Sequence, residues 1–156
     1  ILSITQNKKR KNLKEFLLRK SKDVKYTTYM NYTKYFRLHE FACSCGCKKN
    51  KINRTFLKVL AAARSNSLDI DRSFIPFRIS SGYRCKNHIL SKKNPSSSHI
   101  KGLACDIIIK NSRERAVILG SLIGAGFTRF GLGSNFIHVD LDEDKKQGIM
   151  WDYYGV

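Results

Sequence analysis

A short apolar run that contains one aspartate, residues 103–109, most constrains how this chain can fold. It follows His99 and Gly102, so the chain can turn tightly and return as a buried strand with Asp106 on it. A second apolar run, residues 136–140, carries His138. A catalytic zinc typically takes three His or carboxylate ligands and leaves its fourth position for water. These two histidines and the aspartate match that set in number and chemistry, so we predict a zinc site between the two runs.

The rest of the pattern predicts one α+β domain. Apolar residues repeat at helical spacing after Asn53, a suitable N-cap, and again after Asn111, where the helix should stop before Gly126. Pro76 opens a short extended run. We expect helices over 53–64 and 112–125, a loop over 86–98, and strands over 77–81, 103–109, 128–131, 135–141 and 148–153. The late strands should form a small antiparallel sheet flanked by helices, with the ligands at its loop and strand ends.

The charge of the chain is strongly positive. Its 156 residues include 30 Lys and Arg against 12 Asp and Glu, a formal net charge of +18. Such a charge predicts attraction to a polyanion, and both nucleic acid and anionic bacterial cell wall qualify. Nucleic acid has less support because no RNA-binding, helix-turn-helix or zinc-finger motif accompanies the charge. We divide the chain into a basic N-terminal extension, residues 1–35, and a zinc-binding domain, residues 36–156.

Residues 7–25 concentrate the charge of the extension, with nine Lys and Arg against two acidic residues. Leucines and a phenylalanine interleave with them at helical spacing, which predicts a basic amphipathic helix. That helix either docks on the domain or binds cell wall or nucleic acid. No segment approaches the roughly 18 apolar residues of a membrane span, and the beginning lacks the apolar part of a secretory signal. We therefore expect neither a membrane span nor a signal peptide. We also expect a monomer.

Five cysteines form an odd set. Cys43, Cys45 and Cys47 share one short phrase, and Cys85 and Cys105 lie far downstream. Their spacing matches no standard zinc finger, so we expect buried thiols or one disulfide from the phrase to Cys85, with a structural metal as the alternative. Cys105 neighbours the aspartate on the expected strand, so its side chain should point to the opposite face, into the core.

Three phrases together resemble a known family. They are Ser97-x-His99-x-x-Gly102-x-Ala104-x-Asp106, the later His138-x-Asp140, and the earlier Ser80-Ser81-Gly82-Tyr83-Arg84-Cys85. This pattern is similar to the zinc D-alanyl-D-alanine carboxypeptidases and L-alanyl-D-glutamate endopeptidases, a group that includes bacteriophage endolysins and shares its fold with the hedgehog signalling domain. The resemblance extends over about residues 36–139, including the Cys-rich phrase, and excludes the basic N-terminal stretch.

The resemblance implies a murein peptidase that holds Zn²⁺ with His99, Asp106 and His138 and cleaves by a zinc-activated water. It assigns Arg84 to the position that holds a substrate carboxylate or the developing oxyanion, which suits a permanently charged guanidinium. The alternative for this arginine is a surface salt bridge. Ser97 would bond to substrate or orient the ligand loop.

The general base departs from the family pattern. Carboxypeptidase members place Glu three residues before the last histidine and some endolysins place Asp there, whereas this chain has Asn135, and an amide cannot take the proton. Asp140 shares a strand face with His138, so we predict it as the catalytic base, or else as the acceptor that fixes the tautomer of a liganding histidine. Asp142 lies one step further along that face. His88 is a weaker candidate whose simpler interpretation is a surface histidine.

These inferences predict a zinc metallopeptidase that cleaves peptide bonds of bacterial peptidoglycan, either an endolysin-like endopeptidase or a D-Ala-D-Ala carboxypeptidase. The missing glutamate favours the endopeptidase. Such a protein would be found in the host cytoplasm or a virion and act on the cell wall, to which its basic surface would adhere. Asn135 favours a different class of function, a catalytically inactive zinc-fold domain that binds wall peptide or protein. The charge of +18 motivates a third class of function, that of a basic nucleic-acid-binding protein.

Overall fold

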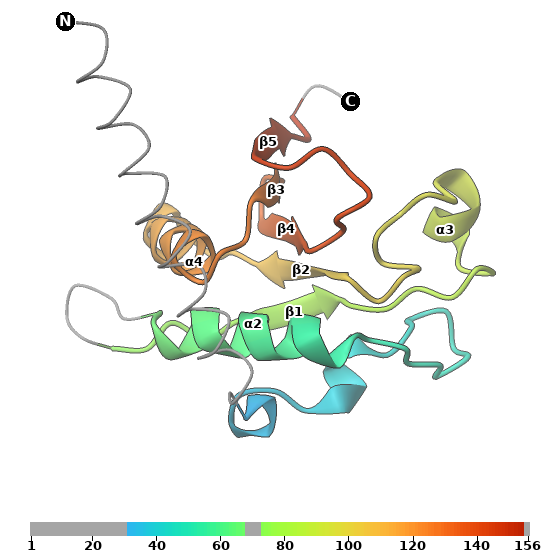
Figure 1. Ribbon diagram of the computed structural model, residues 1–156, viewed down its shortest axis with the longest axis horizontal. Coiled ribbons are helices and arrows are strands. Elements are labelled where there is room, and N and C mark those ends of the chain that lie inside the picture. The colour runs from blue at the N-terminus through green and yellow to red at the C-terminus, as the bar shows by residue number, and fades with distance from the viewer. Residues whose placement is uncertain (1–30, 68–72, 155–156) are drawn as a thin grey trace, which may run out of the picture.

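The computed structural model describes residues 31–67 and 73–154 (Figure 1). The predicted amphipathic helix over 7–25 and most of the basic extension lie outside the described residues. The boundary that we place at residue 36 stays a prediction, although Tyr32 and Phe36 are both buried in the core of the domain.

Five short strands form one sheet in the order β1-β2-β4-β3-β5 (Figure 1). They are β1 (Arg78–Ser81), β2 (Ala104–Ile108), β3 (Arg129–Leu132), β4 (Phe136–Asp140) and β5 (Ile149–Asp152). The helices of the described residues are α2 (Arg54–Ser65), α3 (Ile89–Lys93) and α4 (Ser112–Gly124), with 3-10 turns η1 (Tyr32–Lys34) and η2 (Leu38–Phe41). The predicted α+β class and all five predicted strands are therefore confirmed.

Side-chain caps begin the two long helices where the sequence predicts. The Asn53 carboxamide oxygen accepts a hydrogen bond from the backbone N–H of Phe56, and that of Asn111 accepts from the N–H of Glu114. Gly126 ends the second helix with a φ of +98°, the left-handed conformation that glycine adopts at low cost.

Two predictions about secondary structure are wrong. The sheet is mixed, because β5 pairs parallel with β3 while every other pair is antiparallel. After β4 the chain reverses through residues 141–148 and passes to the far edge of β3, so β5 runs opposite to β4 and parallel to β3. The predicted loop over 86–98 contains α3, because the Leu90 N–H donates to the Nδ1 atom of His88 and the side chain caps a short helix.

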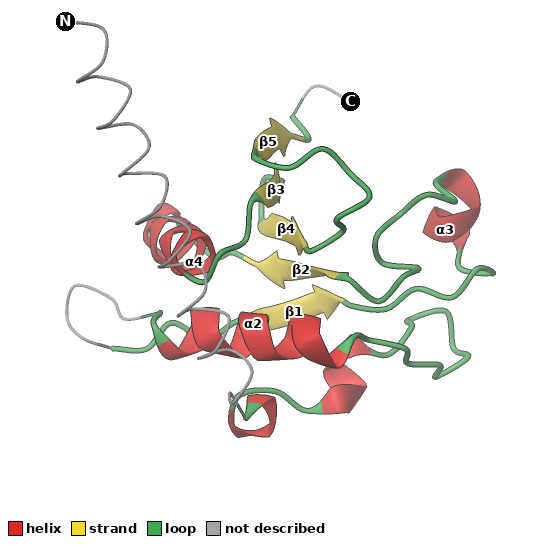
Figure 2. Cartoon of the chain, in the orientation of Figure 1, coloured by secondary structure: helices red, strands yellow, loops and turns green. Residues whose placement is uncertain are grey.

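The two faces of the sheet have different roles. On one face Cys105, Ile107, Ile137 and Val139 are buried in a core that also includes residues of α2 and α4. Figure 2 shows these two helices beside the strands and α3 at the other end of the molecule. Cys105 is fully buried, which confirms its predicted place in the core. The opposite face carries Asp106, His138 and Asp140. No helix in the described part of the chain is long and apolar enough to cross a membrane.

Candidate metal centre and cleft

One row of residues crosses the whole sheet. The strand register pairs Ser81 with Asp106, Asp106 with His138, His138 with Gly131, and Gly131 with Trp151. Paired residues on neighbouring strands point to the same face, so this row brings the aspartate and the second histidine together. The apolar residues on either side of Asp106 point the other way and fix this register by their burial.

Three donor atoms form a compact triangle on this face. The distance from the His138 Nδ1 atom to the Asp106 Oδ1 atom is 2.9 Å, and His99 Nε2 lies 3.2 Å from the former and 3.3 Å from the latter. Zinc bonds of about 2.0–2.1 Å in a tetrahedron place two ligand atoms roughly 3.3 Å apart. The triangle therefore matches three corners of a zinc coordination sphere, and the three residues form a candidate metal centre.

Hydrogen bonds hold the loop that delivers His99. Its Nδ1 atom lies 2.6 Å from the Gly82 carbonyl oxygen, so Nδ1 carries the proton and Nε2 is left to bind a cation. Gly102 turns the loop with a φ of +71°, and a Cβ atom there would overlap the carbonyl oxygen of Lys51. The turn that we predict at Gly102 is confirmed.

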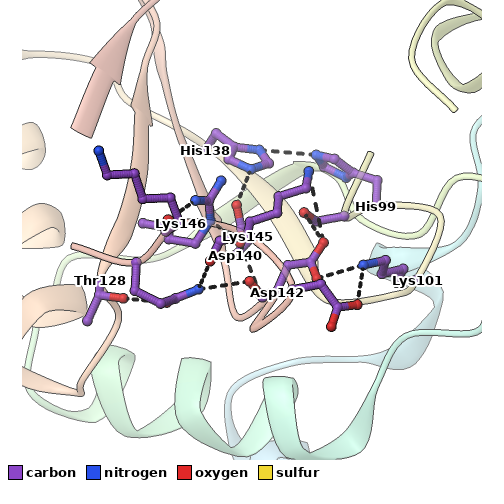
Figure 3. A network of polar contacts seen from close by, with 12 residues as sticks. His99, Lys101, Thr128, His138, Asp140, Asp142, Lys145 and Lys146 are labelled. Carbon is purple, nitrogen blue, oxygen red and sulfur yellow. Dashed lines mark hydrogen bonds and ion pairs between the residues drawn. The ribbon is translucent and has the colours of Figure 1, made fainter. Parts of the chain in front are cut away.

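Asp142 ties the same loop to the segment after β4 (Figure 3). Its carboxylate accepts hydrogen bonds from Ser98 Oγ at 2.9 Å and from Lys101 Nζ at 2.7 Å. Burial would raise the pKa of Asp142, but these bonds outweigh it and lower the pKa. Asp142 does not line the cleft described below, so this aspartate positions the loop that carries the first histidine.

The protonation of the donor residues suits a cation. Burial holds the pKa of His99 below its usual value, so the ring is neutral and free to ligate. Burial would raise the pKa of Asp106, but hydrogen bonds from His138 and His99 lower it well below its usual range. In His138, hydrogen bonds to Asp106 and Asp140 outweigh burial and raise the pKa. Hydrogen-bonding protons thus lie between the three side chains, at the place where a metal ion would bind instead.

Arg84 contacts the metal centre from the β1 side. Its guanidinium donates to the Asp106 Oδ2 atom at 2.6 Å and to the Ser81 hydroxyl at 2.9 Å. The arginine side chain is 14% exposed and lines the cleft. It therefore fixes the aspartate and still presents charge to whatever occupies the cleft.

Asp140 lies on the other side of His138 (Figure 3). Its Oδ2 atom is 3.2 Å from His138 Nε2, the ring nitrogen that is not in the donor triangle. Its Oδ1 atom accepts from Arg129 Nε at 2.8 Å and from the backbone N–H of Asp142 at 3.0 Å. This arrangement fixes the histidine tautomer with Nδ1 toward the metal position.

A cleft of about 530 Å³ opens above the donor atoms. It contains all the site residues that we predict, namely Arg84, Ser97, His99, Asp106, His138 and Asp140. The cleft is also lined by residues that we did not predict from the sequence, among them Lys93, Arg129, Lys145 and the aromatic pair of Trp151 and Tyr153.

The rings reach the site because of a glycine. Gly131 pairs with Trp151, and a Cβ at position 131 would lie 2.8 Å from the Trp151 ring and 2.7 Å from the Tyr153 ring. The Trp151 ring lies 5.6 Å from the His138 ring, between centroids. A glycine inside a predicted strand, opposite a candidate ligand histidine, is the sequence signal that marks this close approach.

The other candidates lie elsewhere. Asn135 is exposed in the turn between β3 and β4 and does not line the cleft. His88 is 8% exposed rather than at the surface, because it caps α3 and contacts Ser44 Oγ at 3.2 Å. Neither residue faces the donor atoms.

The cysteines form a second group of candidate metal ligands. Cys43, Cys45, Cys47 and Cys85 have sulfur atoms that all lie within 4.8 Å of one another. All four are free thiols, and Cys45 and Cys47 are exposed. The expected buried thiols are therefore confirmed for Cys43 and Cys85, whereas the disulfide that we gave as the other possibility is not formed. The loop over 42–50 folds back onto Cys85 and brings the four thiols together.

A comparison with known protein families gave a match. A family model described as Peptidase M15 matches residues 34–140, a segment that contains all three residues of the metal centre. Neither the comparison with curated proteins nor the one with solved structures gave a match. The matched segment covers more than half of the sequence and ends at Asp140. The chain therefore belongs to the M15 family, which is a family of metal-dependent peptidases.

Proposed function

We propose that this protein is a zinc metallopeptidase that cleaves peptide bonds of bacterial peptidoglycan. The observation that carries the proposal is the triangle of His99 Nε2, Asp106 Oδ1 and His138 Nδ1 on the floor of the cleft, with sides of 2.9, 3.2 and 3.3 Å. Three such donors leave a fourth position open toward the cleft, as catalytic zinc sites do. A zinc ion supplies Lewis acidity, which polarises a carbonyl group and makes water acidic.

The residues around the triangle prepare it for this chemistry. The Gly82 carbonyl and Asp140 each bind the ring nitrogen of a ligand histidine that faces away from the metal position. Arg84 holds Asp106 and presents its charge to the cleft, where it stabilises a substrate carboxylate or the negative charge that develops on the carbonyl oxygen. Burial raises the pKa of Tyr153, so its hydroxyl stays protonated and can donate to a bound peptide.

The wall of the cleft suits an acidic peptide. Arg84, Lys93, Arg129 and Lys145 all line it, whereas its only carboxylates among the described residues are Asp106 and Asp140, and both are paired with cations or histidines. Stem peptides of peptidoglycan carry free carboxylates, and cations on the cleft wall attract such substrates. The aromatic pair Trp151 and Tyr153 offers a flat apolar surface for the rest of the peptide.

We assign Asp140 the role of positioning His138, the second of the two roles that the sequence left open. Both of its oxygens are already engaged, by His138 on one side and by Arg129 and the backbone of Asp142 on the other. To act as a base it would first have to release the histidine, whose tautomer it fixes. Arg129 holds this aspartate in place and lies 5.4 Å from the Trp151 ring centroid.

The resemblance and the charge support the cell wall as the place where the protein acts. The family resemblance includes endolysins, and a net charge of +18 favours adhesion to an anionic wall. We therefore propose an endolysin-like endopeptidase of the hedgehog-type zinc fold, which reaches the wall from the host cytoplasm or a virion. Wall pull-down with and without residues 1–25 at rising salt tests the basic segment, and unchanged binding would remove its role.

Digestion of purified murein tests the activity. Zinc-loaded protein and chelator-treated protein are incubated with mureins of several cross-link chemistries, and new peptide ends are identified by mass spectrometry. We expect new ends only with the zinc-loaded protein. The identity of the new ends distinguishes an endopeptidase from a carboxypeptidase that releases D-Ala.

A second candidate is a zinc-fold domain that binds wall peptide without cleaving it. It is favoured by the exposed Asn135 in place of the usual base and by the absence of an unengaged carboxylate in the described part of the cleft. In the murein experiment this candidate predicts sedimentation of zinc-loaded protein with the wall and no new peptide ends.

A further inference from the structure

Two segments that are distant in the sequence bring four thiols to one point outside the cleft. Cys43, Cys45 and Cys47 come from the loop between η2 and α2, and Cys85 comes from the segment between β1 and α3. The sulfur atoms of Cys43 and Cys45 are 3.4 Å apart, and those of Cys45 and Cys85 are 3.5 Å apart. All four sulfur atoms lie within 4.8 Å of one another.

These separations fit one metal ion. Zinc bonds to sulfur of about 2.3 Å in a tetrahedron place the sulfur atoms roughly 3.8 Å apart. The distances of 3.4 and 3.5 Å lie slightly below this value, and no pair of the four sulfur atoms is more than 4.8 Å apart. A multi-iron cluster would require a wider spacing of the thiolates, and four sulfur donors in a tetrahedron are typical of zinc or a single iron. Zinc is also the ion that we propose for the His and Asp centre.

The loop is shaped around the sulfur atoms. Gly46, between Cys45 and Cys47, has a φ of +88°, and Lys48, directly after Cys47, has a φ of +55°, so the chain turns sharply around Cys47. The Cys43 N–H donates to the Lys49 carbonyl oxygen at 2.8 Å, which closes the loop. The Cys85 N–H donates to the Cys43 sulfur at 3.3 Å, and such bonds stabilise a thiolate.

A metal ion binds the deprotonated form of each thiol. A divalent cation would therefore take the place of the thiol protons of this group when it binds.

We propose that Cys43, Cys45, Cys47 and Cys85 hold a structural zinc ion, separate from the His and Asp centre. Four protein ligands close the coordination sphere, as in structural rather than catalytic zinc sites. The ion would join the loop over 42–50 to the segment that carries Arg84. In that segment the Tyr83 N–H donates to the Phe41 carbonyl oxygen at 2.9 Å and the Arg84 N–H donates to the His99 carbonyl oxygen at 3.2 Å. The closed site thus holds the chain next to the catalytic arginine.

Counting zinc in matched variants tests the proposal on the full chain. The protein is produced with zinc, and zinc per chain is measured by mass spectrometry of the elements. We expect Cys45→Ser/Cys47→Ser to hold one zinc ion fewer than the wild type, because both residues are exposed and their loss leaves the core intact. Cys105→Ala, which removes a thiol outside the group, should keep the wild-type content. The test compares zinc per chain between the variants and the wild type, so its outcome does not depend on the proposed peptidase activity.

Cobalt gives a second readout with all four cysteines present. In His138→Ala, which disables the other centre, added Co²⁺ should produce the near-ultraviolet absorption of thiolate-to-cobalt charge transfer. Absence of that absorption would overturn the proposal, as would equal zinc content in the Cys45→Ser/Cys47→Ser variant and the wild type. Disulfides within the group in freshly purified protein, seen as a mass lower by two hydrogens for each, would also contradict it.

Discussion

The His and Asp centre and the four-cysteine group are held by different parts of the fold. Asp106 and His138 are paired residues on adjacent strands, and the burial of their neighbours in the core fixes the register. The cysteines come from two loops whose positions follow from backbone turns and from contacts with residues distant in sequence. Period-two alternation makes Asp106 and His138 predictable as donors on one face of the strands. The position of a donor on a loop, whether His99 or a cysteine, depends on the completed fold.

The two groups also differ in their number of donors. The first has three donor residues and faces a cleft, and the second has four donors and lines no part of that cleft. An open position is needed for catalysis, and a closed sphere is typical of a structural ion. The variants below test this difference, from the largest expected effect to the smallest.

Removing a strand-borne ligand should have the largest effect. In His138→Ala the donor triangle loses one corner, and we expect murein cleavage to fall by roughly 10³-fold or more, because the Lewis-acid contribution of a metal amounts to several kcal/mol. Cleavage is measured as new peptide ends per unit time. His39→Ala removes an exposed histidine of η2 and serves as the control. Cleavage by His138→Ala within tenfold of the wild type would contradict the assignment of this ligand.

Asp140→Asn separates positioning from base catalysis. If Asp140 fixes the His138 tautomer, zinc affinity of the open centre should fall by roughly 10- to 100-fold, as for other partners of ligand histidines. The measurement is competition for zinc with a chromophoric chelator. When zinc is saturating, kcat of the variant should still fall as the pH is lowered, which is the acidic limb of the pH profile. An unchanged zinc affinity together with loss of that limb would instead identify Asp140 as the base.

Gly102→Ala tests the loop that brings His99 to the sheet. We expect a loss of roughly 1–2 kcal/mol in the free energy of unfolding from the positive φ alone, and more from overlap with the Lys51 carbonyl. Denaturant unfolding measures it. Gly120→Ala is the matched control, because this glycine is in α4 with open space around it, and alanine there should stabilise by about 0.5–1 kcal/mol. Equal stability of the two variants would show that the turn does not require glycine.

Asp142→Asn should have the smallest effect, of roughly 1 kcal/mol, because it weakens the hydrogen bonds from Lys101 and Ser98. The pKa of Asp142 is lowered in the folded protein, so its contribution to stability is present above the unfolded carboxyl value of about 3.9 and is lost as pH falls through the folded pKa. Unfolding of wild type and variant between pH 7 and strong acid should therefore converge. A difference that persists in strong acid would mean that the charge is not the cause.

Much of the fold could be predicted because its signals are local. Asn53 and Asn111 cap their helices, and the alternation around Asp106 defines a strand with one polar and one core face. The parallel pairing of β5 could not be predicted, since pairing depends on which strand edge is free after β4 has inserted between β2 and β3. Helix α3 was missed because its cap is a histidine, which is not among the residues that usually begin helices.

The site was predictable to the same extent. Asp106 and His138 were predicted as ligands from their places on expected strands, and His99 and Arg84 were predicted as site residues from the sequence motif and the resemblance. Lys93, Arg129, Lys145 and the two rings near Gly131 were not predicted, because they reach the cleft through the sheet order and through a glycine that leaves room for them. The grouping of Cys85 with the earlier cysteines depends on the same kind of long-range contact.

Stepwise removal of zinc from the purified protein tests the central claim most directly. A chelator of graded strength is added while zinc release and murein cleavage are followed in the same sample. We expect cleavage to vanish as zinc leaves the open three-ligand centre, and to return when zinc is restored, while the zinc bound by four thiolates is retained longest. Murein cleavage that continues at its full rate after all zinc has left the protein would contradict the account.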